Sequence, residues 1–293
     1  MQSNSWLLRP LDLAVLTRWQ VSLMAGGATL FGFCLAAPGH PLAALPAALG
    51  SFFLCAGCSA LNQLQEQDLD SLMHRTMARP LPGGRVSRSF TLFLAMALLL
   101  GSLALYSLYG NPTLLILFLS VLVIYNLLYT PLKRVTPMAL LLGAIPGSLP
   151  PMVGWCAAGG HFLHPAMLAV SGLFFLWQVP HFWLLADRYR DDFARAGLPA
   201  PPLFAQGRRL AWLLPLWLAA MTTLALAFPA LAVMENAYAK WGLVAITATL
   251  VYASFRCAIR PRPCAHLVTL FMLAFMALLL ADAFLASPSG NLL

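Results

Sequence analysis

The sequence predicts an all-α, polytopic membrane bundle, and three observations support this fold class. Hydrophobic residues make up 61% of the 293 residues, only 9% are charged, and the mean hydropathy is +0.81. A soluble domain carries about 25% charged residues. The apolar residues fall into long runs, and the basic residues gather in alternate connections between the runs. We therefore expect a protein surrounded by the lipid bilayer, with no nucleic-acid partner despite a formal net charge of +8.

Nine apolar runs have about the length that crosses the hydrocarbon core, roughly 20 residues. Each is expected to be a helix, because a segment in lipid must satisfy its backbone hydrogen bonds internally. The expected spans are residues 19–37, 42–61, 89–109, 112–130, 138–158, 165–186, 210–229, 241–258 and 266–286. With a cytoplasmic N-terminal segment, residues 1–18, they are expected to form one intramembrane domain over residues 1–293. The first span is longer than the apolar part of a signal peptide, and an Arg- and Ser-rich transit peptide is absent, which favours a bacterial membrane.

The basic residues orient the bundle. Sixteen of the 17 lysines and arginines lie before the first span or in every second connection, and Lys240 lies on the other side. Because basic residues concentrate in cytoplasmic loops, the N-terminus and these connections are expected on the cytoplasmic side of a bacterial inner membrane. An odd number of spans then places the C-terminus outside. The prolines and glycines between Gly143 and Gly154 are expected to let the fifth span bend and pack closely.

Six of the nine acidic residues lie in two short polar loops, at the ends of the second and sixth spans. A carboxylate is costly in so apolar a chain. In the first loop, Asn62, Glu66 and Asp70 stand four residues apart, so a continuing helix places them on one face. Oxygen ligands in such a row suit Mg²⁺, which takes one or two carboxylates together with phosphate oxygens of a substrate. Asp68 lies on another side of that helix. The alternative is a solvated helix end whose acids balance nearby arginines.

The second loop repeats this arrangement after four further spans. Asp187 and Asp191 stand four residues apart, and Asp192 follows directly. The repetition suggests an internal duplication, in which two half-sites face each other across a central cavity open to the cytoplasmic side. Two Mg²⁺ ions held by the acids, with basic side chains around them, would bind one diphosphate from both sides.

The predicted site therefore has three groups of residues. The expected metal ligands are Asn62, Glu66, Asp70, Asp187, Asp191 and Asp192. The expected diphosphate ligands are Arg75, Arg79, Lys133, Arg134 and Arg188. Asp70, Asp191 and Lys133 are expected to act directly in catalysis. Metal ions and basic groups would stabilise a departing pyrophosphate, and the allylic cation that remains would be attacked by an acceptor.

These residues lie in stretches that resemble a known family. Residues 62–81, in which Met73-His-Arg75-Thr76 follows the first acids, resemble the first signature motif of the UbiA superfamily of membrane prenyltransferases. Three further stretches are similar to the branch of that superfamily that farnesylates heme: residues 129–137, 143–155 and 177–183. Residues 192–193 and 197–199 fit the family's second loop as well. The resemblance covers about residues 55–205, and it implies a UbiA-type intramembrane bundle of nine helices.

The resemblance also implies an activity. This activity is transfer of a farnesyl group from farnesyl diphosphate to a vinyl group of heme B, so heme is a substrate and not a cofactor. Mg²⁺ and diphosphate are implied at Asn62, Glu66 and Asp70, although the family usually has Asp where Glu66 stands. Phosphate contacts are implied for Arg75, Arg79, Lys133 and Arg134. Heme A synthase or a terminal oxidase assembly pathway would use the product.

Two features leave the acceptor open. The heme branch usually carries acids just before an aromatic residue in the second loop, and Asp191-Asp192-Phe193 fits that pattern. Asp187-x-x-x-Asp191 looks more like the quinone branch, so a quinone-type prenyltransferase acting on an aromatic acid is the alternative. His181 in the sixth span either contacts the acceptor or packs in the helix through a hydrogen bond.

The positions of the charged residues argue against functions outside this enzyme class. A transporter would carry them near the bilayer midplane, whereas here they lie at one face. A non-catalytic, heme-binding assembly factor would not need two acid clusters. Asp282 lies on the outer side in the last span and is not expected to reach a cytoplasmic diphosphate.

Overall fold

The computed structural model describes residues 9–199, 208–231, 234, 236–259 and 264–286. Throughout these residues the regular structure is helical and no strand occurs, as the composition predicts. Eight helical stretches within the described part are long and apolar enough to cross a membrane. The chain is therefore a multi-pass, all-α membrane protein.

The spanning stretches agree closely with the expected spans. They are Trp19–Ala36, Pro41–Gln65, Arg88–Ser107, Pro112–Leu132, Ala139–Ala157, Pro165–Ala186, Leu214–Leu231 and His266–Leu285. The remaining expected span, residues 241–258, lies inside α13 (Ala237–Ile259), which packs against both α12 (Arg208–Leu226) and α14 (Cys264–Ala286). With 23 residues, α13 also has the length of a spanning helix.

The other helices of the described residues include both the long spanning helices and short helices in the connections. In chain order they are α1 (Pro10–Leu16), α2 (Trp19–Ala36), η1 (Pro41–Ala44), α3 (Leu45–Gln65), α4 (Gln67–Leu72), α5 (Arg88–Ser107), α6 (Pro112–Leu122), the π-helix η2 (Val123–Tyr129), α7 (Thr130–Leu132), α8 (Ala139–Ser148), α9 (Pro150–Ala157), α10 (Pro165–Arg188), α11 (Arg190–Arg195) and η3 (Phe228–Leu231).

Two spans depart from a regular α-helix. The fifth span is divided at Leu149, between α8 and α9, where Pro150 cannot supply a backbone N–H to the helix. The fourth span passes from α6 into η2, and π-helical turns of this kind are often found at functional sites. The expected bend in the fifth span is present, whereas the π-helix in the fourth has no signal in the apolar pattern.

Close helix packing builds the core around α2. This helix packs against α3 and α9. Gly154 of α9 makes the second contact possible, because a Cβ atom there would collide with the backbone oxygen of Thr29. Phe31, Leu173 and Phe275 are buried in one cluster that joins α2, α10 and α14. The N-terminal and C-terminal parts of the chain therefore share a single core.

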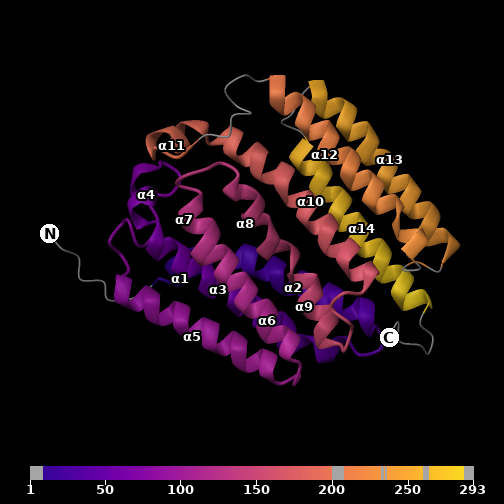
Figure 1. Cartoon of the computed structure of the whole chain (residues 1–293). Coiled ribbons are helices and arrows are strands. Elements are labelled where there is room, and N and C mark those ends of the chain that lie inside the picture. Colours follow the sequence, from indigo (N-terminus) through magenta and orange to yellow (C-terminus); the bar gives the residue numbers. More distant parts are fainter. Residues whose placement is uncertain (1–8, 200–207, 232–233, 235, 260–263, 287–293) are drawn as a thin grey trace.

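The arrangement of the helices brings the two acidic loops together. Figure 1 shows α10, α12, α13 and α14 lying together along one side of the bundle. The short helices α4 and α11, which follow α3 and α10, lie at the same end. This end is where the predicted site residues gather.

Candidate active site

The first acidic loop begins where α3 stops. Glu66 caps α3 with non-helical dihedral angles, φ −118° and ψ 15°, and α4 starts at the next residue. The backbone nevertheless keeps the i, i+4 hydrogen bonds from Glu66 N to Asn62 O (3.0 Å) and from Asp70 N to Glu66 O (2.8 Å). The three residues therefore stay in register across the break. All three are buried, with exposed fractions of 5% for Asn62, 3% for Glu66 and 1% for Asp70.

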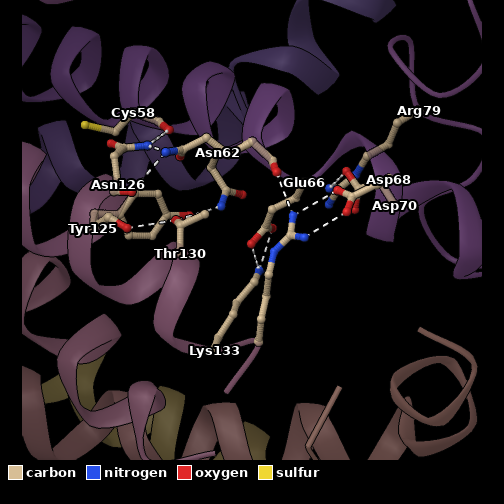
Figure 2. Close-up of polar contacts among 12 residues, drawn as sticks. Cys58, Asn62, Glu66, Asp68, Asp70, Arg79, Tyr125, Asn126, Thr130 and Lys133 are labelled. Carbon is tan, nitrogen blue, oxygen red and sulfur yellow. Dashed lines mark hydrogen bonds and ion pairs between the residues drawn. The ribbon is translucent and has the colours of Figure 1, made fainter. Parts of the chain in front are cut away.

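Each buried acid of this loop has its own basic partner (Figure 2). The Nζ atom of Lys133 lies 2.5 Å from both carboxylate oxygens of Glu66 and donates its hydrogen bond to Oε2. Nη1 of Arg79 donates to Oδ2 of Asp70 at 2.6 Å. Such pairing is what allows carboxylates to be buried at all. Lys133 and Arg79, which were predicted to bind diphosphate, thus lie directly against two of the predicted metal ligands.

Asp68 points the other way, into solvent. Its side chain is 62% exposed and receives two hydrogen bonds from Arg134, of 2.8 and 2.9 Å. Arg134 also donates to the backbone oxygen of Gln65 at 2.7 Å. The guanidinium of Arg134 holds the pKa of Asp68 below its ordinary value, and Asp68 raises the pKa of Arg134. Arg134 is therefore fixed beside the end of α3 through an exposed ion pair.

The oxygen atoms in this loop fit a hard divalent cation. Nδ2 of Asn62 donates to Oγ1 of Thr130 at 3.0 Å, and this orients the amide so that its carbonyl oxygen is the remaining acceptor. The carboxylate of Glu66 is buried, and the ammonium of Lys133 lies against its Oε1 as well as its Oε2. Together with Asp70 these atoms give an amide oxygen and two carboxylates, the kind of ligands that Mg²⁺ takes. Among the residues the structure describes, no group of three His, Cys, Asp or Glu side chains forms a metal site by itself.

A pair of tyrosines extends the site from Lys133. The rings of Tyr125 and Tyr129 stack with their centroids 5.5 Å apart, and Nζ of Lys133 lies 5.6 Å from the centre of the Tyr129 ring. Both tyrosines belong to η2. Gly143 of α8 makes room for Tyr129, because a Cβ atom would lie 2.8 Å from its ring. This explains the glycine at the start of the segment that was expected to let the fifth span pack closely.

In the second loop, Asp192 faces the first loop. It is 7% exposed, and its two oxygens accept the backbone N–H groups of His74 and Arg75 at 3.0 and 3.1 Å. Arg195 lies 3.5 Å from the same carboxylate. Asp192 was predicted to be a metal ligand, whereas here both oxygens are used to hold the loop that follows α4.

Tyr189 and a small apolar cluster complete this contact between the loops. The guanidinium groups of Arg75 and Arg188 lie 4.9 and 5.8 Å from the centre of the Tyr189 ring. Two predicted diphosphate ligands, one from each loop, are therefore positioned by the same aromatic side chain. The buried residues of the cluster come from both loops: Leu69, Met73, Ala196 and Leu198.

The remaining predicted residues lie on α10 and α11. Asp191 is exposed in the first turn of α11. Asp187 lies in the last turn of α10, and its side chain is outside the described residues. His181 is exposed on α10, and its ring stacks on Trp177 with centroids 5.8 Å apart.

Sequence reasoning missed Thr130, Tyr125, Tyr129 and Tyr189 as parts of the site. For the two tyrosines of η2 a signal exists, since Tyr125, Tyr129 and Lys133 stand four residues apart. No comparable pattern marks Thr130 or Tyr189, because each is defined by a partner from a distant part of the chain.

Asp282, the buried acid of the last span, has a structural partner. Its Oδ1 atom accepts the backbone N–H of Asn236 at 2.9 Å, directly before α13. Asn236 in turn accepts the N–H of Tyr238 at 2.8 Å. Figure 1 shows that α14 ends at the opposite end of the bundle from α4 and α11. Asp282 thus contributes to helix capping, away from the acidic loops.

The chain is similar over most of its length to proteins of one family. Residues 25–279 match the model of the UbiA prenyltransferase family. A protoheme IX farnesyltransferase of Nitratidesulfovibrio vulgaris (strain DP4) is 40% identical over 271 residues, which is 92% of this chain and 94% of the relative. The protoheme IX farnesyltransferase of Geobacter sulfurreducens is 41% identical over 230 residues, 78% of this chain and 84% of the relative.

Solved structures share the fold at lower sequence identity. A UbiA homolog from Aeropyrum pernix K1 superposes with a TM-score of 0.74 at 21% identity, covering 90% of this chain and 98% of that one. A UbiA homolog from Archaeoglobus fulgidus, bound to GPP and Mg²⁺, gives a TM-score of 0.68 at 21% identity, with coverage of 94% and 98%. These likenesses concern the fold of the helical bundle.

Proposed function

Because the chain belongs to the UbiA prenyltransferase family and is a membrane prenyltransferase, we propose that it joins a farnesyl group to heme B. The donor is farnesyl diphosphate and the product is heme O. Relatives that cover nearly the whole chain at about 40% identity carry the name protoheme IX farnesyltransferase, and this favours heme over an aromatic acid as acceptor.

The observation that supports this function most directly is the pairing of Glu66 with Lys133 and of Asp70 with Arg79 at the end of α3. Both acids are buried, and both bases are partly accessible, with side-chain exposures of 25% and 19%. A site of this composition can exchange partners. Glu66 and Asp70 would hold the cation of a metal diphosphate, and Lys133 and Arg79 would then be released to bind its phosphate oxygens. Opposite charges stay neighbours before and after binding, so neither state leaves a buried charge unpaired.

The other site residues have supporting roles in this proposal. Arg75 and Arg188 approach the diphosphate from the two loops, and Arg134 approaches from the end of α7. Asn62, held by Thr130, supplies an amide oxygen to the metal. Asp187 and Asp191 provide the second half-site, for which we propose a second ion, and Asp192 keeps the two loops together. Mg²⁺, when bound, would withdraw charge from the departing diphosphate.

The reaction then has three steps. The bond between C1 of the farnesyl group and the diphosphate oxygen breaks, and the electron pair leaves with pyrophosphate, where Lys133 and Arg79 stabilise it. The π electrons of a heme vinyl group form a bond to C1. Water adds to the carbocation left on the vinyl group and loses a proton, which completes the hydroxyethylfarnesyl substituent. His181, exposed on α10 beside Trp177, is proposed to contact the acceptor.

We also propose a location for this reaction. The distribution of basic residues supports a bacterial inner membrane, with the N-terminus and both acidic loops in the cytoplasm and the C-terminus outside. Heme A synthase or the assembly of a terminal oxidase would use the product.

A deletion strain tests the acceptor. Heme and quinone pools are extracted from the deleted strain and from the strain complemented with the wild-type gene or with its Asp70→Asn variant. Loss of heme O and heme A, restored by wild type and not by the variant, is the expected result. A normal heme pool with loss of a prenylated quinone would replace this proposal by the quinone-type function.

A further inference from the structure

Arg18 lies at the junction of α1 and α2 in a strained backbone conformation. Its dihedral angles are φ 45° and ψ 49°, and among the described residues no other non-glycine has a positive φ. This left-handed conformation is unfavourable for an L-residue, because its Cβ atom comes too close to the following carbonyl oxygen. Such strain persists where neighbouring contacts enforce it, and it is concentrated at functional sites.

The contacts that enforce it come from the site helix. Nε2 of Gln63, the residue after Asn62, donates to the backbone oxygens of Val15 and Leu16 at 3.1 and 2.8 Å. Oγ of Ser22 donates to the backbone oxygen of Thr17 at 2.8 Å. Leu16 is fully buried in a cluster with Leu81 and Val86, and Leu64 of α3 packs against that cluster. The junction is thus attached to α3 directly beside the predicted metal ligand Asn62.

The Arg18 side chain lies beside the tyrosine pair of the site. Nη1 of Arg18 donates to the hydroxyl group of Tyr125 at 3.2 Å. Arg18 is exposed, and among the described residues no carboxylate lies within 4.0 Å of it. A guanidinium has five N–H donors, so most of them are available to a ligand. Arg79, Lys133 and Arg134, by contrast, each have an acidic partner.

Arg18 and Lys133 approach different rings of the stacked pair, Arg18 at Tyr125 and Lys133 at Tyr129. Lys133 is committed with Glu66 to the proposed diphosphate site. Arg18 therefore provides a separate positive charge, beyond the aromatic pair, for an anionic group of the second substrate. In heme B one edge of the flat macrocycle carries two carboxylates, and the opposite edge carries the two vinyl groups, one of which reacts.

We propose that Arg18 binds a carboxylate of the acceptor, so that the acceptor's reactive edge is directed toward the diphosphate. This inference rests on the proposed function. A guanidinium fork matches a carboxylate in a bidentate manner, which fixes orientation as well as charge. Arg18 is then a specificity-determining residue of the acceptor site, and the strained junction is what aims it.

The test compares two acceptors in the purified full-length protein, reconstituted in lipid nanodiscs with farnesyl diphosphate and Mg²⁺. One acceptor is heme B and the other is its dimethyl ester, in which both carboxylates are blocked. Wild type should prefer heme B in kcat/KM by about tenfold or more, the effect of losing a charge-assisted hydrogen bond. Arg18→Gly should abolish this preference and leave the KM for farnesyl diphosphate unchanged. Arg18→Lys should retain part of the preference.

The glycine variant also separates recognition from folding. Glycine adopts a φ of 45° without strain, so Arg18→Gly should have an unchanged or higher Tm. The control is Arg88→Gln, which replaces an exposed arginine that donates to Gln67 and should keep the preference. A preference retained in Arg18→Gly, or a raised KM for farnesyl diphosphate, would overturn the assignment. A lowered Tm together with an equal loss of activity toward both acceptors would also overturn the assignment. If wild type farnesylates neither acceptor, the proposed function itself fails.

Discussion

Asp70 has the smallest exposed fraction of the site acids whose side chains the structure describes, 1%, and its charge is matched by Arg79 at 2.6 Å. Replacing it by asparagine preserves the shape but removes a carboxylate from the proposed metal site. We expect Asp70→Asn to lower kcat by about 10²–10³-fold, the cost of losing one group that stabilises charge in the transition state. Glu66→Asp should be mild, because it keeps a carboxylate and restores the residue usual in the family. Steady-state kinetics at matched protein levels provide the measurement.

Asp282 is the matched control for that substitution. It is also a buried acid, 2% exposed, but it accepts a backbone N–H at the other end of the bundle. Asp282→Asn should therefore lower the Tm while prenyl transfer per folded molecule stays nearly unchanged. If it damaged turnover as much as Asp70→Asn at equal abundance, the site at the acidic loops would be wrong, and a transport-like role for the buried acid would become the better interpretation.

The Asp68–Arg134 pair predicts a pH dependence of stability. Arg134 lowers the pKa of Asp68 from its ordinary value of 3.8. The pair therefore stabilises the folded state above that value, and the stabilisation is lost as the pH falls through the lower pKa of the folded state. Because Asp68 is largely exposed, we expect the contribution to stay below about 1 kcal/mol. Wild type and Asp68→Asn should differ by a small constant Tm between pH 6 and 8 and converge in acid. A difference that grows in acid would contradict this assignment.

At the scale of elements, the contact between the two acidic loops depends on Asp192. Asp192→Asn leaves one oxygen for two N–H groups, so the loop that carries Arg75 loses a hydrogen bond. The KM for farnesyl diphosphate should rise by roughly tenfold, while the Mg²⁺ concentration for half-maximal rate stays the same. Asp191→Asn should raise the Mg²⁺ concentration for half-maximal rate and leave the KM for farnesyl diphosphate nearly unchanged, because Asp191 is exposed and is proposed to bind the metal. A shift in the Mg²⁺ concentration for half-maximal rate of Asp192→Asn would instead show that Asp192 is a metal ligand.

A double-mutant cycle tests the route of that effect. If Asp192 acts by positioning Arg75, then Asp192→Asn should add little once Arg75→Ala is present. Combined with Lys133→Met, it should add its full effect, because Lys133 is paired with Glu66, whereas Asp192 is hydrogen-bonded to His74 and Arg75. Full additivity with Arg75→Ala would contradict positioning through Arg75.

The sequence predicts the features that depend on residues close together along the chain, because its patterns are local. Apolar runs gave the spans, and the spacing of four gave the register of Asn62, Glu66 and Asp70, since both depend on neighbours along one helix. The break at Glu66 did not disturb that register, because the i, i+4 bonds continue across it. The turn of Asp192 toward His74 and Arg75 joins residues more than a hundred positions apart, and local periodicity carries no information on such a contact. The strained geometry of Arg18 likewise depends on Gln63 of another helix.

For the whole molecule, the basic residues predict the orientation in the membrane. With the acidic loops in the cytoplasm, a reporter fused after Leu293 should behave as external. A second reporter inserted after Gly84, which lies exposed in the connection between α4 and α5, should behave as cytoplasmic. If both reporters lay on the same side, the predicted odd number of spans would be wrong, and with it the placement of the C-terminus.

The mass of the product formed by the purified protein tests the whole account most directly. Carboxylates at a diphosphate site would repel the substrate without a cation, so turnover should require a divalent metal. Incubation with heme B, farnesyl diphosphate and Mg²⁺ should yield heme that has gained one farnesyl group and one hydroxyl group, with release of pyrophosphate. Formation of this product and release of pyrophosphate should both stop in EDTA and return when Mg²⁺ is added in excess. Undiminished turnover in EDTA, or unchanged heme together with prenylation of an aromatic acid, would contradict the account.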